Sequence, residues 1–261
     1  MPTDKMQTLE RTIALLDCFS IEQPELGVRE AARLIHLSSS TTGRLLAAMK
    51  ECGVLSQNPV THLYSLGGKV LSWAGVYTAN LDVRNKALPA MEELWHSTQE
   101  TISLYVLEGH ERVCVERMES PQNVRIVARI GRRLPLYAGS AGKVFLAFLP
   151  PARRDQILKE MTLAPLTTKT IVNFDQLLQE LEKIRHQGYA VSYGEWVLDA
   201  SGVASPIFDQ KGEVIAALTI SGPGQRFTEE KAAEYGVEVQ RVANQISYEM
   251  GYYQEDAAVQ A

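Results

Sequence analysis

The sequence predicts an α+β protein, in which a linker helix joins a small winged helix-turn-helix to a larger domain with an antiparallel sheet flanked by helices. Between residues 28 and 66, two closely spaced helical patterns precede two short strand-like runs. An apolar helical pattern follows, and beyond residue 80 helical and strand patterns alternate. We therefore expect domains at residues 1–66 and 81–253, a linker helix at 67–80 and a flexible tail at 254–261.

The composition is typical of a globular protein in a reducing compartment. Hydrophobic residues make up 45% of the chain and charged residues 22%, which is enough apolar material for well-packed cores. No apolar run is long enough to cross a bilayer, and the first residues lack an apolar export signal. The three cysteines are far apart, and Cys18 and Cys52 fall at core-facing helical positions. We therefore expect no disulfide and a cytoplasmic location.

The first predicted helix covers Met6–Ser20, and a loop that contains Pro24 follows at Ile21–Gly27. Apolar residues recur in this helix at helical spacing and predict one buried face, formed by Leu9, Ile13, Leu16 and Phe19. A second, short helix is predicted at Val28–Leu37. Its apolar positions are Ala31, Ala32, Leu34 and Ile35.

The most informative stretch is Ser38–Gly53, which has the pattern of a helix with two different faces. The side predicted to enter the core consists of Thr42, Leu45, Leu46, Met49 and Cys52. The outer side is small and hydroxylic near its start and carries one long cation, Arg44. Ser38 is the expected N-cap, and Gly53 stands where a glycine would end the helix. Taken alone, this pattern is more typical of an ordinary capped surface helix than of a helix that binds DNA.

The neighbouring segments favour DNA binding. Only a few residues separate this helix from Val28–Leu37, and two strand-like runs follow, Val54–Ser56 and Leu63–Leu66. In such a winged helix-turn-helix, small residues let the second helix approach the major groove, and hydroxyls or an arginine reach phosphates or bases. We expect DNA contacts from eight residues: Arg29, Ser39, Ser40, Thr41, Gly43, Arg44, Lys50 and His62.

The charge balance predicts only weak non-specific DNA binding. The net charge is −5, and residues 1–66 carry six Lys/Arg against seven Asp/Glu. Residues 28–66, however, carry four cations and two anions. A local basic face of this kind is sufficient for a dimer that reads two half-sites.

The segment Lys69–Asn80 resumes helical periodicity after Gly67 and Gly68 end the hairpin. Its apolar positions are Val70, Leu71, Trp73, Ala74 and Tyr77. An isolated helix of this kind would expose a large apolar surface. It therefore packs either against a second copy of the chain or against its own domains, and the sequence leaves both alternatives open.

The larger domain begins with a predicted helix at Asp82–Thr98. Alternation and turn signals predict strands at 101–107, 113–117, 124–130, 189–193, 203–208 and 213–221. Further helices are expected at 139–149, 155–161 and 175–187. Thr228 is the expected N-cap of a final helix that ends near Tyr253.

Several motifs together resemble the IclR family of bacterial transcription factors over nearly the whole chain. Ser40-Thr41 followed by Arg44-Leu45-Leu46 resembles the family's recognition helix, and Tyr64-Ser65-Leu66-Gly67 resembles the end of its wing. In the larger domain the similar motifs are 139–143 with 144–147, 188–190, 194–195, 204–209 and 221–223. The resemblance implies a GAF-like effector domain, homodimers that often pair into tetramers, and a repressor or activator of a catabolic operon.

Two segments depart from the family pattern. Ser38-Ser39 replaces the Pro-Lys that is common before the Ser-Thr pair, and Gly43 replaces a bulkier residue. The operator sequence is therefore not carried over from the family. Trp196–Gly202 differs from the commoner P-G-V-x-C/A-I, and this segment lies near the pocket in relatives. The identity of the ligand is therefore not carried over either.

The resemblance implies an effector pocket at seven positions: Ile126, Leu134, Ser140, Ala141, Gly202, Thr219 and Ser221. Backbone amides at a helix start favour an anion, and hydroxyls on the last strand would orient it. Residues 110–133 carry six Arg and three Glu, which favours a small acidic metabolite. Two alternatives stay open. A solvated sheet face or a subunit contact would also explain the arginines Arg125, Arg129, Arg132 and Arg133. Close packing would also explain why residues 140–142 are small.

An enzyme and a ligand-independent DNA-binding dimer are the alternative functions. Gly139–Lys143 resembles a phosphate loop, but Val144 stands where a Ser or Thr should follow the lysine. No G-x-S-x-G motif occurs, the five histidines lack metal-ligand spacing, and Glu195 with Asp199 is weak support for acid–base chemistry. We therefore expect no catalytic residue, metal or cofactor.

The expected partners are operator DNA and a small organic, anionic effector, with no membrane involved. Linker helices would join two winged domains of a homodimer or a dimer of dimers. Effector binding would change the spacing of those domains, and operator affinity would change because the recognition helices must match the half-sites.

Overall fold

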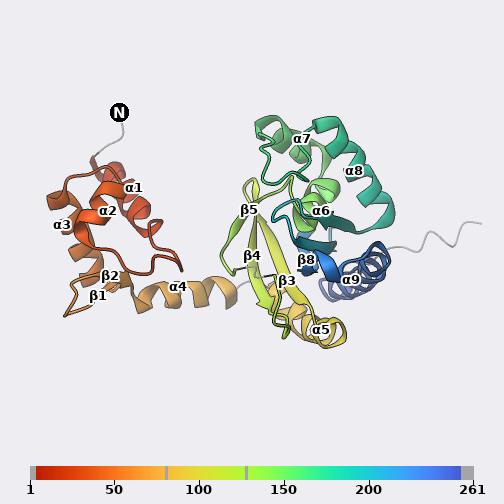
Figure 1. Cartoon of the computed structure of the whole chain (residues 1–261), viewed down its shortest axis with the longest axis horizontal. Coiled ribbons are helices and arrows are strands. Elements are labelled where there is room, and N and C mark those ends of the chain that lie inside the picture. The colour runs from red at the N-terminus through yellow and green to blue at the C-terminus, as the bar shows by residue number, and fades with distance from the viewer. Residues whose placement is uncertain (1–3, 80–81, 127–128, 254–261) are drawn as a thin grey trace, which may run out of the picture. The chain divides into compact units, whose positions relative to one another are not determined.

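The computed structural model describes residues 4–79, 82–126 and 129–253 (Figure 1). The chain divides into two compact units, Met1–Asn80 and Leu81–Ala261. The expected tail at 254–261 lies outside the described residues. Among the described residues, no helix is both long and apolar enough to span a membrane.

The first unit is a winged helix-turn-helix. Its helices are α1 (Asp4–Leu16), α2 (Val28–Leu34) and α3 (Ser39–Glu51), and its wing strands are β1 (Leu55–Gln57) and β2 (Tyr64–Leu66). The two strands pair antiparallel, and Leu26 adds a bridge to Tyr64. A Cβ on Gly67 would lie 2.4 Å from the Gly53 carbonyl oxygen, so glycine is needed where the wing closes on the end of α3.

The predicted ends of α3 are confirmed. The Ser38 hydroxyl accepts a hydrogen bond from the Thr41 amide at 3.2 Å, and Gly53, with φ of +74°, directly follows the C-cap. Thr42, Leu46 and Met49 are buried as expected.

The predicted burial is wrong at several helix positions of this unit. Leu9 and Ile13 are exposed, and Leu15 makes the fully buried contact of α1 instead. Cys52 at the end of α3, which was predicted to face the core, is also exposed. Helical spacing finds the apolar stripe but does not distinguish a core contact from an uncovered surface.

The linker helix α4 (Gly68–Ala79) leaves its large apolar side chains uncovered. Leu71 is 77% exposed, Val76 62% and Trp73 50%. Within the first unit, the described residues therefore leave these side chains exposed. The two alternatives that the sequence left open, packing on a second copy and packing on the same chain, both stay open.

The second unit is a six-stranded antiparallel sheet in the order β5-β4-β3-β8-β7-β6. Its strands are β3 (Thr101–Glu108), β4 (Glu111–Met118), β5 (Arg133–Pro135), β6 (Ala190–Tyr193), β7 (Ala200–Phe208) and β8 (Val214–Pro223). Its helices are α5 (Asp82–Thr98), α6 (Ser140–Phe148), α7 (Pro151–Glu160), α8 (Phe174–Gln187) and α9 (Glu229–Glu249), with a 3-10 turn, η1, at Gly224–Arg226.

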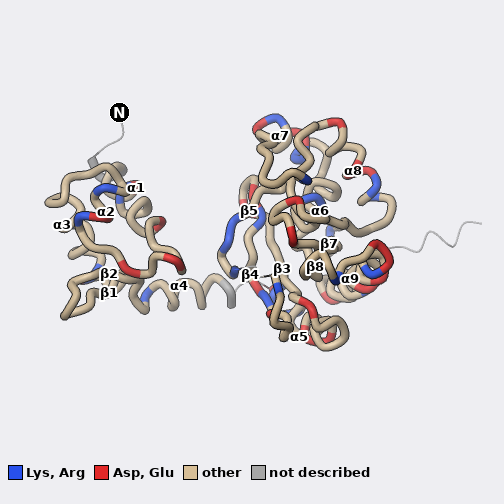
Figure 2. Tube along the Cα trace, viewed as in Figure 1, with Lys and Arg blue, Asp and Glu red and all other residues tan. Residues whose placement is uncertain are grey.

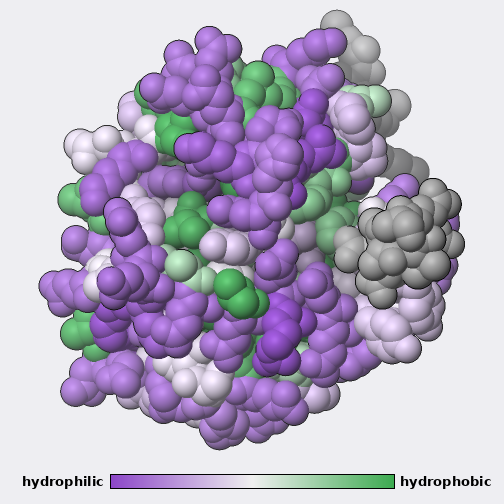
Figure 3. Space-filling view, turned by 90° about the vertical axis from the view of Figure 1, so that its right-hand side faces the viewer, coloured by the Kyte–Doolittle hydropathy of each residue, from purple (hydrophilic) through white to green (hydrophobic). Residues whose placement is uncertain are grey.

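Each face of this sheet has its own core. Alternate strand residues such as Leu104 and Leu218 pack with α5 and α9, whereas Tyr105 and Ala217 face α6 and α8 (Figure 1). The predicted N-cap Thr228 is confirmed by a hydrogen bond from the Lys231 amide at 3.2 Å. The molecular surface visible in Figure 3 is mainly hydrophilic, and its hydrophobic residues form small separate groups.

Two predictions for this unit are wrong. The described residues of 124–130 form no strand, and the short strand Arg133–Pro135, which was not predicted, pairs with β4. The helix predicted from Asp155 begins at Pro151, because proline favours the first helical position.

Candidate functional site

The start of α3 presents the predicted hydroxylic face. Ser39, Ser40 and Arg44 are exposed, and Thr41 is half-buried because it lies against the Ser38 cap, 2.9 Å from its hydroxyl. Gly43 is partly covered by α2, and a Cβ there would meet Val28 at an ordinary contact distance of 3.5 Å. The exposed face therefore consists of the serines and Arg44.

The remaining predicted DNA contacts lie on α2, at the end of α3 and in the wing. Arg29 is exposed near the start of α2. The Lys50 ammonium donates to the Gln57 side chain at 2.9 Å, which joins α3 to β1. His62 is exposed in the wing turn with φ of +60°. The Gln57 side chain also donates to the His62 carbonyl at 3.1 Å, which joins Lys50 to the wing turn through Gln57.

All seven predicted effector residues line one cavity of about 300 Å³ in the second unit. The cavity lies on the face of the sheet that α6 covers. Ser140 and Ala141 come from the start of α6, Thr219 and Ser221 from β8, and Gly202 from β7. Leu134 of β5 and Ile126 complete the predicted set.

The strands and Gly202 shape the floor of the cavity. The Thr219 hydroxyl donates to the Ser103 carbonyl at 3.2 Å, and the Ser221 hydroxyl to the Thr101 carbonyl at 3.4 Å. A Cβ on Gly202 would lie 3.3 Å from the Ser221 Cβ and 3.5 Å from the Ser140 hydroxyl oxygen. Glycine at this position therefore keeps space open between β7, β8 and α6.

Sequence reasoning did not assign Tyr105, Arg112, Gly139 and Ser192 to the pocket, and it placed the segment Trp196–Gly202 near the pocket only by resemblance. Tyr105, Arg112, Gly139 and Ser192 line the cavity, and so do Trp196, Val197, Ala200 and Ser201 from the segment that departs from the family pattern. Alternation along β4 could have placed Arg112 on the same face as Cys114, but a cation at a strand end is normally taken as solvated.

The wall is strongly cationic. Four arginines line the cavity, namely Arg112, Arg125, Arg129 and Arg132, and no Asp or Glu is among its described lining residues. Figure 2 shows Lys and Arg gathered in the segment beside β4 and β5. The Arg132 guanidinium lies over the Trp196 ring, 5.1 Å from its centroid. An anion would find a favourable potential here.

Burial changes the acidity of groups in this wall. It raises the pKa of the Tyr105 phenol to about 12, so the hydroxyl stays neutral and can donate a hydrogen bond. It also raises the pKa of the neighbouring Cys114 thiol to about 12. Burial lowers the pKa of the Arg112 guanidinium, because removal from water disfavours its charged form.

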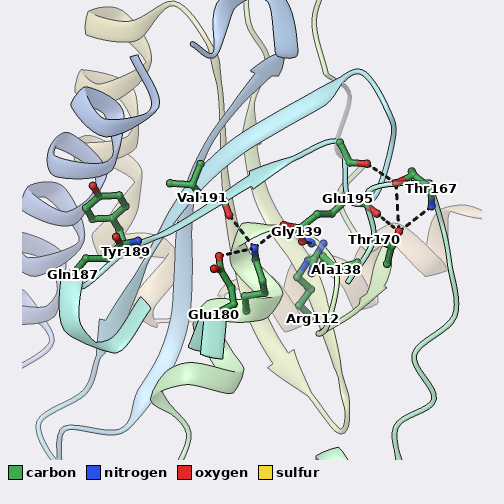
Figure 4. A network of polar contacts seen from close by, with 12 residues as sticks. Arg112, Ala138, Gly139, Thr167, Thr170, Glu180, Gln187, Tyr189, Val191 and Glu195 are labelled. Atoms are coloured by element: carbon green, nitrogen blue, oxygen red, sulfur yellow. Dashed lines mark hydrogen bonds and ion pairs between the residues drawn. The ribbon is translucent and has the colours of Figure 1, made fainter. Parts of the chain in front are cut away.

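A buried ionic network supports the cavity from behind (Figure 4). The Lys143 ammonium, 1% exposed, lies 2.6 Å from Glu195 Oε1 and 3.1 Å from Glu180 Oε1, and it donates to the Val191 carbonyl at 2.9 Å. Glu195 Oε2 accepts from the Gly139 amide at 2.9 Å. The network therefore ties the start of α6 to the segment that carries Trp196.

This network accounts for residues that could have indicated an enzyme. Lys143 belongs to the core rather than to a phosphate loop, and Glu195 is ion-paired and buried while Asp199 is exposed. Among the residues that the structure describes, no three His, Cys, Asp or Glu side chains are grouped as metal ligands would be.

Comparisons with known proteins agree with this geometry. A family profile described as "IclR helix-turn-helix domain" matches residues 8–59, and one described as "Bacterial transcriptional regulator IclR C-terminal" matches residues 75–248. The HTH-type transcriptional regulator KipR of Bacillus subtilis is 34% identical over 95% of this chain and 99% of its own.

Solved structures are similar as well. The crystal structure of the Thermotoga maritima IclR has a TM-score of 0.80 at 32% identity, covering 95% of this chain and 100% of that one. An IclR homolog from Microbacterium hydrocarbonoxydans, complexed with 4-hydroxybenzoate, has a TM-score of 0.82 at 28% identity, covering 93% of this chain and 98% of that one.

Proposed function

This chain belongs to the IclR family of DNA-binding transcriptional regulators, and from that premise we propose that it controls its operator in response to a small acidic metabolite. Proteins of this family are regulators rather than enzymes. The observation that carries the proposal is the cavity lined by four arginines and by no described carboxylate. Its volume of about 300 Å³ lies at the lower end of the range of small-molecule pockets, which suits a small organic acid.

In this proposal α3 enters the major groove with its hydroxylic face, and the neighbouring residues of α2 and the wing hold the phosphate backbone. Ser39, Ser40, Thr41 and Gly43 allow close approach, and Arg44 grips a guanine or a phosphate. Arg29, Lys50 and His62 contact phosphates. The location of these exposed side chains along α2, α3 and the wing turn supports the assignment.

A gel-shift titration of the full chain on its own promoter tests the DNA-binding part. Arg44→Ala should weaken binding by about 1–3 kcal/mol, selectively among operator sequences if Arg44 reads a base and uniformly if it holds a phosphate. Arg153→Ala removes an exposed arginine from α7 of the second unit, outside the proposed DNA-binding residues, and is the matched control. Equal binding by Arg44→Ala and wild type would contradict the assignment of α3.

The oligomer in this proposal is a homodimer or a dimer of dimers, held partly by the apolar face of α4. Exposed Leu71, Trp73 and Val76 support that contact. Effector binding would then alter the spacing of the two winged domains, and operator affinity would change with it. Control of a catabolic operon in the bacterial cytoplasm completes the proposal.

Thermal unfolding with a set of small organic acids tests the sensor part. A bound effector should raise the Tm of the second unit and change operator affinity in the gel shift. Tight operator binding that no acid alters would favour the alternative of a ligand-independent DNA-binding dimer.

A further inference from the structure

Arg112 differs from the other arginines of the cavity because it is held rigidly inside the protein. It lies in β4, is 4% exposed, and pairs in register with Leu134 of β5. Its Nη1 atom donates to the carbonyl oxygens of Pro135 and Ala138, both at 2.7 Å. These two hydrogen bonds hold one edge of the guanidinium. Arg125 and Arg132, by contrast, are exposed.

The charge of Arg112 is only partly balanced within the described part of the chain, because Glu195 favours its charged form without pairing with it directly. No Asp or Glu lies within ion-pair distance of it there, and its Nε is buried with no hydrogen-bond acceptor. Its closest aromatic neighbour is Tyr105, whose ring centroid lies 5.6 Å from the guanidinium carbon. Because a buried charge without a direct ion-pair partner is destabilising, a ligand that pairs with it gains more than one that meets a solvated arginine.

The free side of Arg112 faces the start of α6. A Cβ built on Gly139 would lie 3.0 Å from Arg112 Nη2, the nearest atom to it. Glu195 already occupies the Gly139 amide, so the unsatisfied amides of the first helical turn begin at Ser140. Gly139, Ser140 and Arg112 all line the cavity. A buried guanidinium and a helix N-terminus therefore converge on one wall.

We propose that Arg112 is the specificity-determining residue of this cavity and binds the carboxylate of the effector through its unpartnered N–H groups. This inference rests on the proposed function, which it deepens by naming the group that recognises the ligand. The backbone N–H groups at the start of α6 donate hydrogen bonds to the same carboxylate. The remainder of the organic acid packs against Leu134, Ile126 and Trp196, and the exposed arginines attract it to the opening.

Isothermal titration of the full chain with acid and amide pairs tests the inference. The probes are acetate, benzoate, phenylacetate and 4-hydroxybenzoate, each compared with its neutral primary amide. At least one acid should bind wild type, and its amide should bind at least tenfold more weakly. Arg112→Met should weaken binding of the acid at least tenfold and leave the amide unchanged, so that the preference for the acid disappears.

Two further variants separate the role of Arg112 from a general loss of charge or of structure. Arg133→Met removes the neighbouring arginine, which pairs with Glu108 and Glu111 outside the cavity, and should keep the wild-type preference. Arg112→Lys keeps the charge without the planar fork, and should still lose several-fold in affinity for the acid. If Arg112→Met does not fold, the affinity of Arg112→Lys for the acid tests the proposal instead. An affinity equal to that of wild type would overturn it.

The outcomes also distinguish this inference from the proposed function. An unchanged preference of Arg112→Met for the acid over the amide overturns the role of Arg112. If the same variant still shows a ligand-dependent gel shift, the proposed function as a ligand-responsive regulator stands. If an amide binds as well as its acid and releases the operator, the cavity senses a neutral ligand and Arg112 does not select it. If none of the acids binds wild type, the proposal of carboxylate recognition is overturned.

Discussion

Replacing Lys143 by methionine should destabilise the second unit strongly. The substitution removes the ammonium that lies 2.6 Å from Glu195 and 3.1 Å from Glu180. The Glu195 carboxylate, 8% exposed, then keeps a single described partner, the Gly139 amide. Removing one member of a buried ion pair costs about 3–5 kcal/mol, because the remaining charge stays buried and uncompensated. Methionine fills much of the volume that the lysine side chain leaves, so a cavity contributes little to this value.

Differential scanning calorimetry of the full chain measures the effect. For a domain of this size, ~1 kcal/mol shifts the Tm by about 2–4 °C, so the transition of the second unit should fall by roughly 6–20 °C. Lys183→Met, an exposed lysine of α8, is the matched control and should stay within about 0.5 kcal/mol of wild type.

A double variant isolates the ionic part of this loss. Glu195→Gln combined with Lys143→Met should recover part of the stability, because neither partner then leaves a buried charge unpaired. A loss below about 1 kcal/mol in Lys143→Met alone would refute the reasoning, since it would mean that water or another group replaces the ammonium at no cost.

Three further predictions follow from the cavity, the linker helix and the buried thiol. Ser221→Leu should fill the space beside Gly202 and abolish the response to any acid in the gel shift, with operator binding intact; loss of both would indicate misfolding. Leu71→Glu with Val76→Glu should shift sedimentation toward monomer, and an unchanged oligomer would contradict packing through α4. Burial raises the pKa of the Cys114 thiol from 9.0 to about 12, so the folded state holds the thiol proton more tightly than the unfolded state does. The free energy of unfolding, measured by urea titration at a series of pH values, should therefore contain the full contribution of this thiol below pH 9 and lose it as the pH approaches 12.

Local signals in the sequence were sufficient for most of the first unit. The Ser38 cap, the buried Leu46 and the glycine after α3 depend on interactions within a few residues, so spacing and residue type determine them. The strand predictions that were correct share this property, because short turns bring β3 and β4, and β7 and β8, together as neighbours.

The wrong predictions concern residues whose partners are distant or outside the chain. Leu9 and Ile13 form a regular apolar stripe on α1, but no described residue covers them. The alternation near Ile126 looks like a strand, yet Ile126 and Arg125 line the cavity instead. Val124 and Ile130 of the same apolar set are exposed, so the alternation here does not mark one buried side of a strand.

The sequence did not indicate that Lys143 and Arg112 are buried. Their surroundings differ, and this difference indicates which ligand the second unit binds. Lys and Arg are expected at the surface, so only the fold reveals that Lys143 and Arg112 are enclosed. Lys143 meets carboxylates of its own chain, whereas Arg112 meets carbonyls and an aromatic ring. A buried charge that no carboxylate contacts directly costs stability, and a bound anion offsets part of that cost. The acid that raises the Tm of wild type should therefore raise it least in Arg112→Met, a result that arginines acting only at the opening would not produce.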